Sequence, residues 1–243
     1  MPQYLIFQIK GAMASWGEAA VGEYRGSDDR PTASALGGLL AAALGLRRDQ
    51  EADLQALHAG YLFGVEVCES GALLRDYHTI QVPGRSTLKG QKHVTRKDEL
   101  AFRRTDLNTI LSTRDHRLGV HHLVAVQAHA HAPHTLARLR EALLKPAFVL
   151  YLGRKSCPLS APLHPCVIDA EHLMAAFVQY RHGLAGNADA GLPRALAWTD
   201  GMEAGMPSHL SVTRKDRLIH RGAWQHGERV EHLAMLQATA ERA

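Results

Sequence analysis

The order of the apolar patterns along the chain most narrows the folds that it can adopt. Two periodicities recur: alternation over a few residues, which predicts a β-strand, and leucines at helical spacing, which predict a helix. In chain order they predict strand 4–10, helix 30–46, strand 61–67, strand 120–128, helix 134–144 and strand 147–152. This order is that of an α+β, ferredoxin-like fold, whose open sheet is the scaffold of the RNA-recognition motif.

A basic segment interrupts this order between the second and third strands. Residues 85–117 carry nine Lys or Arg against four Asp or Glu, a net charge of +5, while the whole chain has a net charge of +4. Arg outnumbers Lys by 21 to 7 along the chain, and a guanidinium can donate two hydrogen bonds to one phosphate. A GC-rich genome also raises Arg content, so the clustering is the stronger sign. It indicates a nucleic-acid partner rather than a membrane surface.

The last third of the chain carries weaker signals. Residues 182–207 are rich in Gly, Ala and Pro and predict a long loop, while 208–222 and 228–236 are candidates for a terminal strand pair. We therefore expect an RNA-binding domain over residues 1–157 and a smaller β-rich region over residues 158–243.

Several classes of protein lack support in the sequence. No apolar segment is long enough to span a membrane, and the first residues lack the layout of a signal peptide. Cys68, Cys157 and Cys166 form no Cys-x-x-Cys pair, which favours a reducing cytoplasm over a disulfide framework. Neither a nucleotide-binding glycine loop nor a Gly-x-Ser-x-Gly elbow occurs, so we expect no cofactor and no nucleophilic catalysis.

Sixteen histidines raise the question of a metal site. The clusters are His121 with His122, His129 with His131 and His134, and His164 beside Cys166. Residues i and i+2 of a strand share a face, so His129 and His131 are able to share one metal ion. Because no zinc-site spacing and no nearby carboxylate accompanies them, we expect no metal.

Two further stretches contain residue types that RNA-binding proteins use. Residues 151–165 begin with an aromatic, a glycine and two cations, which suits a loop that stacks on a base and holds phosphate. An ordinary turn with solvated cations explains the same residues equally well. Trp16, after the first strand, is more often a core anchor than a stacking platform.

Four stretches together resemble a known family: "MASWGE", "RPTASALGGLLAAALG" with "RRD" beyond it, "LRDYHT", and "LLKPAFVLYLGRKSCPLSAPL". In this order they resemble the Cas-five family of type I-E CRISPR effector complexes (Cascade), well over residues 1–163 and loosely beyond. The resemblance implies a non-catalytic subunit that holds the 5′ handle of the CRISPR RNA in antiviral defence. Its neighbours are the backbone subunit and the large subunit, and it meets target DNA through the complex. The implied fold is a modified RNA-recognition motif (RAMP fold) with a thumb over about residues 77–118.

The resemblance also implies which residues contact RNA. Arg114 matches an Arg at the base of the family's thumb, and Tyr151 matches an RNA-contacting Tyr. The full set is Arg114, Tyr151, Arg154, Lys155, Ser156, the helix-entry residues Arg30, Thr32 and Ser34, and the thumb cations Lys89, Lys92, Arg96 and Lys97. A helix N-terminus naturally receives phosphate, which supports the helix-entry group. This chain departs from its relatives at His116, where they commonly carry Tyr, and at Gly119, where they commonly carry Asp.

Two alternatives remain open. A related type I-C branch cleaves CRISPR RNA precursors without metal, with a Tyr, Lys and His set. Here Lys92 and His93, with Tyr24 or Tyr77, would supply a proton shuttle and a cation for phosphorane charge. The chain is alternatively a docking wedge for the large subunit, which is compatible with RNA binding.

Overall fold

The computed structural model describes residues 1–17, 20, 22–88, 90, 95–184, 192–223 and 225–236. Their strands are β1 Gln3–Ala14, β2 Tyr24–Arg25, β3 Tyr61–Glu69, β4 Ala72–Pro83, β5 Leu107–Ala128, β6 Cys166–Asp169, β7 Ala195–Thr199, β8 Leu210–His220 and β9 Gln225–Met235. The helices are α1 Ala33–Leu44, α2 Glu51–Ala59, α3 Arg96–Glu99, α4 Leu136–Leu144 and α5 Leu173–Leu184, with a 3-10 turn at Arg104–Asp106.

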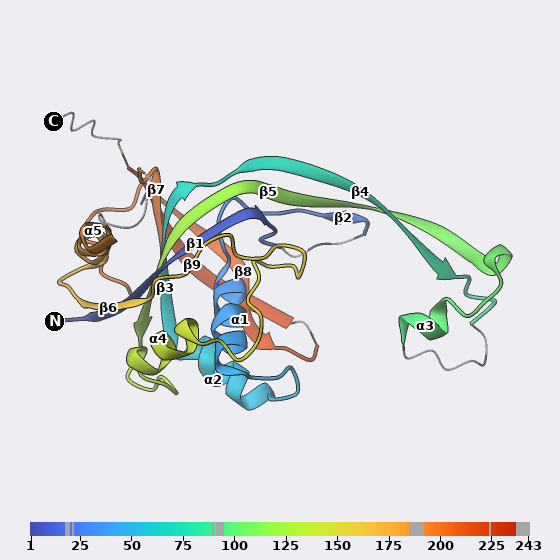
Figure 1. The fold of residues 1–243 in the computed structure, drawn as a ribbon, viewed down its shortest axis with the longest axis horizontal. Coiled ribbons are helices and arrows are strands. Elements are labelled where there is room, and N and C mark those ends of the chain that lie inside the picture. The colour runs from blue at the N-terminus through green and yellow to red at the C-terminus, as the bar shows by residue number, and fades with distance from the viewer. Residues whose placement is uncertain are drawn as a thin grey trace.

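One mixed α/β body is built on a sheet with the order β6-β1-β5-β3-β7-β9-β8 (Figure 1). Its neighbouring strands are antiparallel, and β2 and β4 both pair with β5 outside this path, β2 in parallel. The sheet is continuous from the first residues to the C-terminal strands, because β7 pairs with β3 and then with β9.

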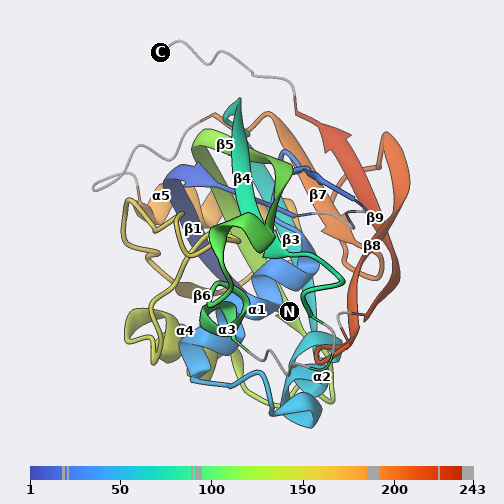
Figure 2. The ribbon, with the colours of Figure 1, turned by 90° about the vertical axis from the view of Figure 1, so that its right-hand side faces the viewer.

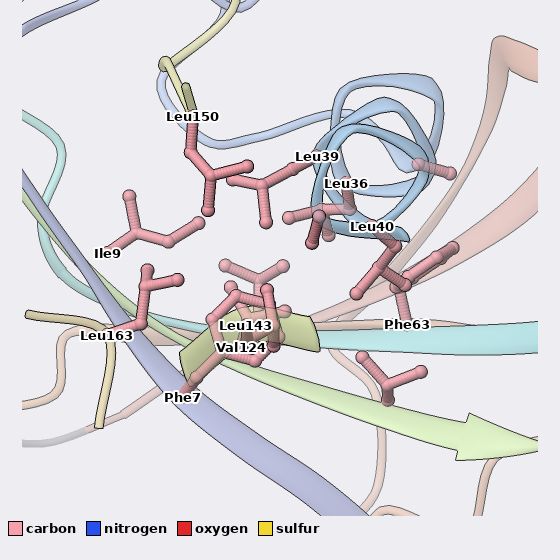
Figure 3. Packing of buried hydrophobic residues seen from close by; sticks show 14 of the residues in the cluster. Phe7, Ile9, Leu36, Leu39, Leu40, Phe63, Val124, Leu143, Leu150 and Leu163 are labelled. Atoms are coloured by element: carbon pink, nitrogen blue, oxygen red, sulfur yellow. The ribbon is translucent and has the colours of Figure 1, made fainter. Parts of the chain in front are cut away.

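Strand β1 is buried on both faces, which explains its strongly apolar sequence. Leu5, Phe7 and Ile9 pack on the face covered by α1, α2 and α4. Tyr4 and Ile6 point to the opposite face, against α5. Figure 3 shows the first of these cores, where strand side chains meet leucines of α1. The predicted strand 4–10 is confirmed, and Trp16 is buried in the same core as expected.

Helix α1 begins and ends where the sequence indicates. The Thr32 side chain accepts a hydrogen bond from Ala35 N, and Gly45 closes the helix in the left-handed conformation at φ 84°. A Cβ atom on Gly37 would lie 2.2 Å from the His58 ring, so glycine is needed for the close approach of α2. Helix α2 itself was not predicted.

The predicted strand 147–152 is wrong. The backbone amides of Ala147 and Phe148 donate to Ala43 O and Ala42 O, so this segment runs along the end of α1. Beyond it only Tyr151 makes an isolated bridge, to Pro158. The edge strand beside β1 is β6 instead. An apolar run of six residues fits a strand and a helix-packing loop equally well, and here the carbonyls of α1 are the hydrogen-bond partners.

The predicted loop 182–207 is also partly wrong. Helix α5 extends to Leu184, and residues 195–199 form the buried strand β7 between β3 and β9. The remaining residues 185–191 lie outside the described part. The predicted terminal pair is confirmed, because β8 and β9 form an antiparallel hairpin.

The basic segment is part of a long two-stranded arm, which we define as residues 72–118. Strand β4 pairs with the first half of β5 from Ala72 opposite Leu118 to Pro83 opposite Leu107. Figure 1 shows this arm leaving the body, with α3 at its far end. Figure 2 looks down the arm, with α1 and α2 below it and β8 and β9 to one side.

Candidate nucleic-acid interface

Three arginines meet where the arm joins the body, and we call them the arm-root cluster: Arg25, Arg114 and Arg154. Arg114 lies on β5, paired in register with Arg25 of β2 on one side and with Asp76 of β4 on the other. Arg154 comes from the loop after α4, and its Nη1 lies 3.2 Å from Nε2 of His116. The structure therefore brings together two predicted residues that are forty positions apart in the sequence.

The positive charge of this cluster is poorly compensated. Burial lowers the pKa of Arg154, and repulsion from Arg114 lowers it further. Burial also lowers the pKa of His116, with Arg154 as the next cause, so this ring stays neutral beside the guanidinium. In the described part of the chain neither Arg114 nor Arg154 forms an ion pair with a carboxylate. An anion bound here would relieve the repulsion.

The loop that carries Arg154 is fixed by its backbone. Gly153 has a φ of +82°, and a Cβ atom on it would lie 1.8 Å from Ser15 O. Ser15 N donates to Leu152 O at 3.1 Å, and Cys157 N donates to Arg154 O at 2.9 Å. Only glycine fits this position, and the tight turn determines where the Arg154 side chain starts.

A buried carboxylate on the other side of β5 braces the arm root. Asp115 accepts hydrogen bonds from Tyr24 OH at 2.5 Å and from Arg75 Nε at 2.9 Å. Its backbone carbonyl also accepts from Ser15 Oγ at 3.1 Å. Hydrogen bonds, first of all from Arg75, hold the pKa of Asp115 below its ordinary value. The brace therefore ties β2, β4 and β5 to Ser15, the residue that follows β1, at the point from which Arg114 projects.

A groove on the arm is lined by residues of β4, by Arg114 of β5, and by Arg96 and Leu100 at the start and just past the end of α3. Arg114 lines it together with Arg96 of α3, so two predicted RNA contacts share one hollow of about 450 Å³. Arg96 also pairs with Glu99 at 2.6 Å. The groove is lined by His78, Thr79, Ile80, Gln81, Arg96, Leu100 and Arg114.

The other predicted RNA-contacting residues are not gathered as closely as the arm-root cluster. Tyr151 is half-buried beside its bridge partner Pro158, while Lys155, Ser156 and Lys97 are exposed. Lys89 and Lys92 lie outside the described residues.

The start of α1 does not offer the phosphate site that the sequence suggests. The backbone amide of Ala33 donates to the Asp216 carboxylate at 2.8 Å. Thr32 is buried and uses its hydroxyl to cap Ala35 N at 3.1 Å, with Ser34 Oγ 3.1 Å from the same hydroxyl. The chain's own side chains therefore already occupy this helix terminus.

Arg30 is also committed to the protein interior. Its Nε donates to Glu231 at 3.0 Å and its Nη1 donates to Asp29 at 2.7 Å, in a network that also contains Arg214, Arg229 and Asp216. This network joins α1 to the β8–β9 hairpin. We assign Arg30 and Thr32 structural roles and leave them out of the interface.

The alternative catalytic set is not gathered in the described part. Lys92 and His93 lie outside it, and Tyr77 is exposed on β4. The Tyr24 hydroxyl is held by Asp115, and this hydrogen bond is the first cause of a raised Tyr24 pKa. A phenolate at Tyr24 is therefore disfavoured.

The histidine clusters form no metal-binding group of three or more His, Cys, Asp or Glu within the residues described. His129 and His131 stack with ring centroids 5.3 Å apart. His122 is buried against Trp16, and burial lowers its pKa to about 3. No disulfide joins any two of Cys68, Cys157 and Cys166. No helix in the described ranges is long and apolar enough to cross a membrane.

Sequence reasoning missed the residues that build the arm root around Arg114. Arg25 and Asp115 are single charged residues in polar surroundings, and no spacing distinguishes them. Arg75 stands inside "LRDYHT", so its presence in a recognisable stretch was the one available signal.

The chain is similar to known proteins over most of its length. A family model described as CRISPR-associated protein (Cas_Cas5) matches residues 4–230. The CRISPR system Cascade subunit CasD of Escherichia coli (strain K12) is 34% identical over 188 residues, covering 74% of this chain and 78% of the relative. A solved chain described as CRISPR RNA-guided surveillance complex matches with a TM-score of 0.63 and 19% identity, covering 98% of this chain and 91% of that one. Another, described as crystal structure of Cas protein, has a TM-score of 0.59 and 21% identity, covering 97% and 95%. The two structural likenesses show a common fold.

Proposed function

This chain belongs to the CRISPR-associated Cas5 family, and from that membership we propose that it is a CRISPR RNA-binding subunit of a type I-E Cascade effector complex. Its role is to hold the 5′ handle of the guide RNA beside the backbone subunit and the large subunit. It works in the cytoplasm without a cofactor and meets target DNA only through the assembled complex.

The strand order supports the RNA-binding fold expected for this role. In β6-β1-β5-β3 each neighbour is antiparallel, which is the order that two interleaved βαβ units produce. We assign these strands to a modified ferredoxin-like (RAMP) fold. The arm of residues 72–118 is then the thumb, and β7, β8 and β9 belong to the smaller C-terminal β region.

The observation that carries the proposal is the charge of Arg114 and Arg154, which no ion pair within the described residues neutralises, although Asp76 lies opposite Arg114 in the ladder. These two guanidiniums, which form no ion pair in the part of the chain that the structure describes, lie beside a third, Arg25, at the root of a projecting arm. A phosphate accepts bidentate hydrogen bonds from Arg, and successive phosphates of a single strand suit several such cations in a row. RNA laid across the arm root reaches Arg114 first and continues toward Arg96 or toward the loop of Arg154.

Binding without cleavage is the better supported activity. Tyr24, one candidate for the catalytic tyrosine, is engaged with Asp115 and Arg75. The metal-independent endoribonuclease remains the second candidate, because Lys92 and His93 stand in the basic segment.

A titration of handle RNA against matched variants tests the proposal. We expect Arg114→Ala and Arg154→Ala each to weaken binding by about tenfold or more and to flatten the salt dependence, since each phosphate contact on a single strand contributes a slope of about −0.7. The control is Arg138→Ala on α4, which removes the same charge from an exposed pair with Glu141. Equal losses in all three variants, or none, would contradict the proposed RNA site.

A further inference from the structure

An apolar groove lies between α4 and the loop that precedes β6, away from the arm. Its volume is about 390 Å³, and Leu144, Val149 and Leu159 are among the side chains that line it. Val149 is 84% exposed and Leu144 is 52% exposed. Figure 1 places α4 and the arm tip toward opposite ends of the molecule. The groove is therefore far from the arm tip, and none of the residues that line it is among the residues assigned to RNA.

The walls of this groove are held rigidly by the core. Gln8 donates its backbone amide to Leu163 O at 2.8 Å and its side-chain amide to Pro162 O at 2.7 Å. Tyr180 OH donates to His164 O at 2.8 Å. A partner that fills a preformed groove loses less conformational entropy than one that must order it, so this geometry favours binding.

The charged residues around the groove indicate which kind of partner would bind there. None of its lining residues is Asp or Glu, while His164 lines it and Lys145 lies between two lining residues. Arg140 donates to the carbonyl of Pro165, another lining residue, and the one carboxylate of α4, Glu141, is paired with Arg138. Positively charged side chains therefore lie at the edge of the apolar groove. The lining residues also include no Phe, Tyr or Trp on which a nucleobase would stack, and His164 is their one aromatic ring, which favours protein over RNA as the occupant.

We propose that this groove docks an apolar segment with flanking carboxylates from a neighbouring protein subunit. The inference rests on the proposed role in a multisubunit complex, and it adds the docking site and the chemistry of the partner segment. Val149 and Leu144 supply the apolar contact, and Arg140 and Lys145 pair with the carboxylates. Burial of one aliphatic side chain of this size corresponds to at least about tenfold in affinity.

Reconstitution of the complex tests the docking site independently of RNA binding. Val149→Asp and the double variant Arg140→Glu with Lys145→Glu would each be co-expressed with the guide RNA and the other Cascade protein subunits. Native mass spectrometry would then give the composition. We expect one protein subunit to fall in occupancy by about tenfold or more, while the purified variants bind handle RNA like the wild type. Val230→Asp, which changes an exposed valine of β9 away from the groove, should leave the composition intact.

The outcomes distinguish this inference from the proposed function. A full complement of subunits with Val149→Asp would overturn the docking site while leaving the RNA role untouched. Loss of a self-associated form of the purified chain in the same variant would mean that a second copy occupies the groove, which also overturns it. A photoreactive residue at position 149 that crosslinks to RNA instead of protein would do the same. A wild-type chain that binds no RNA and joins no complex would instead refute the proposed function.

Discussion

Asp115 and Arg75 lie opposite each other in the β4–β5 ladder, and the guanidinium contacts both carboxylate oxygens, with Nε 2.9 Å from Oδ1 and Nη2 3.2 Å from Oδ2. Successive residues of a strand point to opposite faces. The same contact that holds Asp115 on one face of β5 therefore holds its neighbour Arg114 on the other. The brace and the proposed RNA contact are linked by one peptide bond.

Asp115→Asn should loosen the arm root. The substitution removes the negative charge of the carboxylate to which both Arg75 and Tyr24 donate hydrogen bonds. Because Arg75 is half-exposed, we expect a loss of only about 1 kcal/mol in the free energy of unfolding. Because the pKa of Asp115 is lowered in the folded protein, the charge of Asp115 stabilises the fold at high pH. This stabilisation is present above the ordinary pKa of 3.8 and is lost as the pH falls below it. Urea unfolding of both proteins across this range measures the difference, which should vanish at the acid end. A constant difference at every pH would exclude the charge as the cause.

Arg114 should act through its planar fork rather than through charge alone. Arg114→Lys keeps the net charge but cannot donate two parallel hydrogen bonds to one phosphate. We expect it to lose much of the RNA affinity that Arg114→Ala loses, about fivefold or more. The measurement is a binding titration at one fixed salt concentration. Wild-type affinity in Arg114→Lys would leave only a steering role for this residue.

Gly153→Ala should displace the loop of Arg154. Its Cβ atom would lie 1.8 Å from a backbone carbonyl, so the loop must move in addition to the usual cost of a positive φ. We expect stability to fall by more than about 1 kcal/mol and RNA binding to weaken in parallel. Gly201→Ala is the matched control, since it has a φ of +92° but its Cβ atom would lie 3.7 Å from Leu62, an ordinary contact. If both variants bind RNA equally, the turn does not position Arg154.

Repeat RNA should survive incubation with the purified chain in EDTA. The binding proposal predicts an intact substrate on a denaturing gel, because no proton shuttle is required of the chain. Specific cleavage that disappears in His93→Ala would establish the endoribonuclease instead. His131→Ala, which changes another histidine far from the basic segment in the sequence, serves as the control.

His58 should make stability depend on pH. Burial, with smaller repulsion from His226, lowers its pKa to about 4 from the ordinary 6.5. The unfolded chain takes up this proton first, so the contribution is fully present above pH 6.5 and is lost as the pH falls from there toward 4. His58→Gln should reduce the slope of the unfolding free energy in this window by up to about 1.4 kcal/mol per pH unit. An unchanged slope would mean that the ring is protonated in the folded protein.

The sequence by itself determined the elements whose pattern reflects one buried face. Strand β1, helices α1 and α4, and the β8–β9 pair follow from periodicity and capping residues, because burial and hydrogen bonding at these sites act over a few neighbouring positions. Recognisable stretches were sufficient to identify the family. They were also sufficient to select Arg114 and Arg154 as candidates, although not to bring them together.

Only the tertiary structure decided the conformation of segments with an ambiguous apolar pattern and the partners of individual charged residues. The apolar run 147–152 packs along α1 because its backbone amides donate hydrogen bonds to the carbonyls of Ala42 and Ala43. Strand β7 forms in a Gly- and Ala-rich stretch because its backbone pairs with β3 on one side and with β9 on the other. Arg30 is not part of the proposed interface because, in the folded chain, it donates a hydrogen bond to Glu231, about two hundred residues away in the sequence. Periodicity records which face of an element is buried, but the partner of a charge or of a backbone amide depends on contacts between residues distant in sequence, and one local pattern does not encode them.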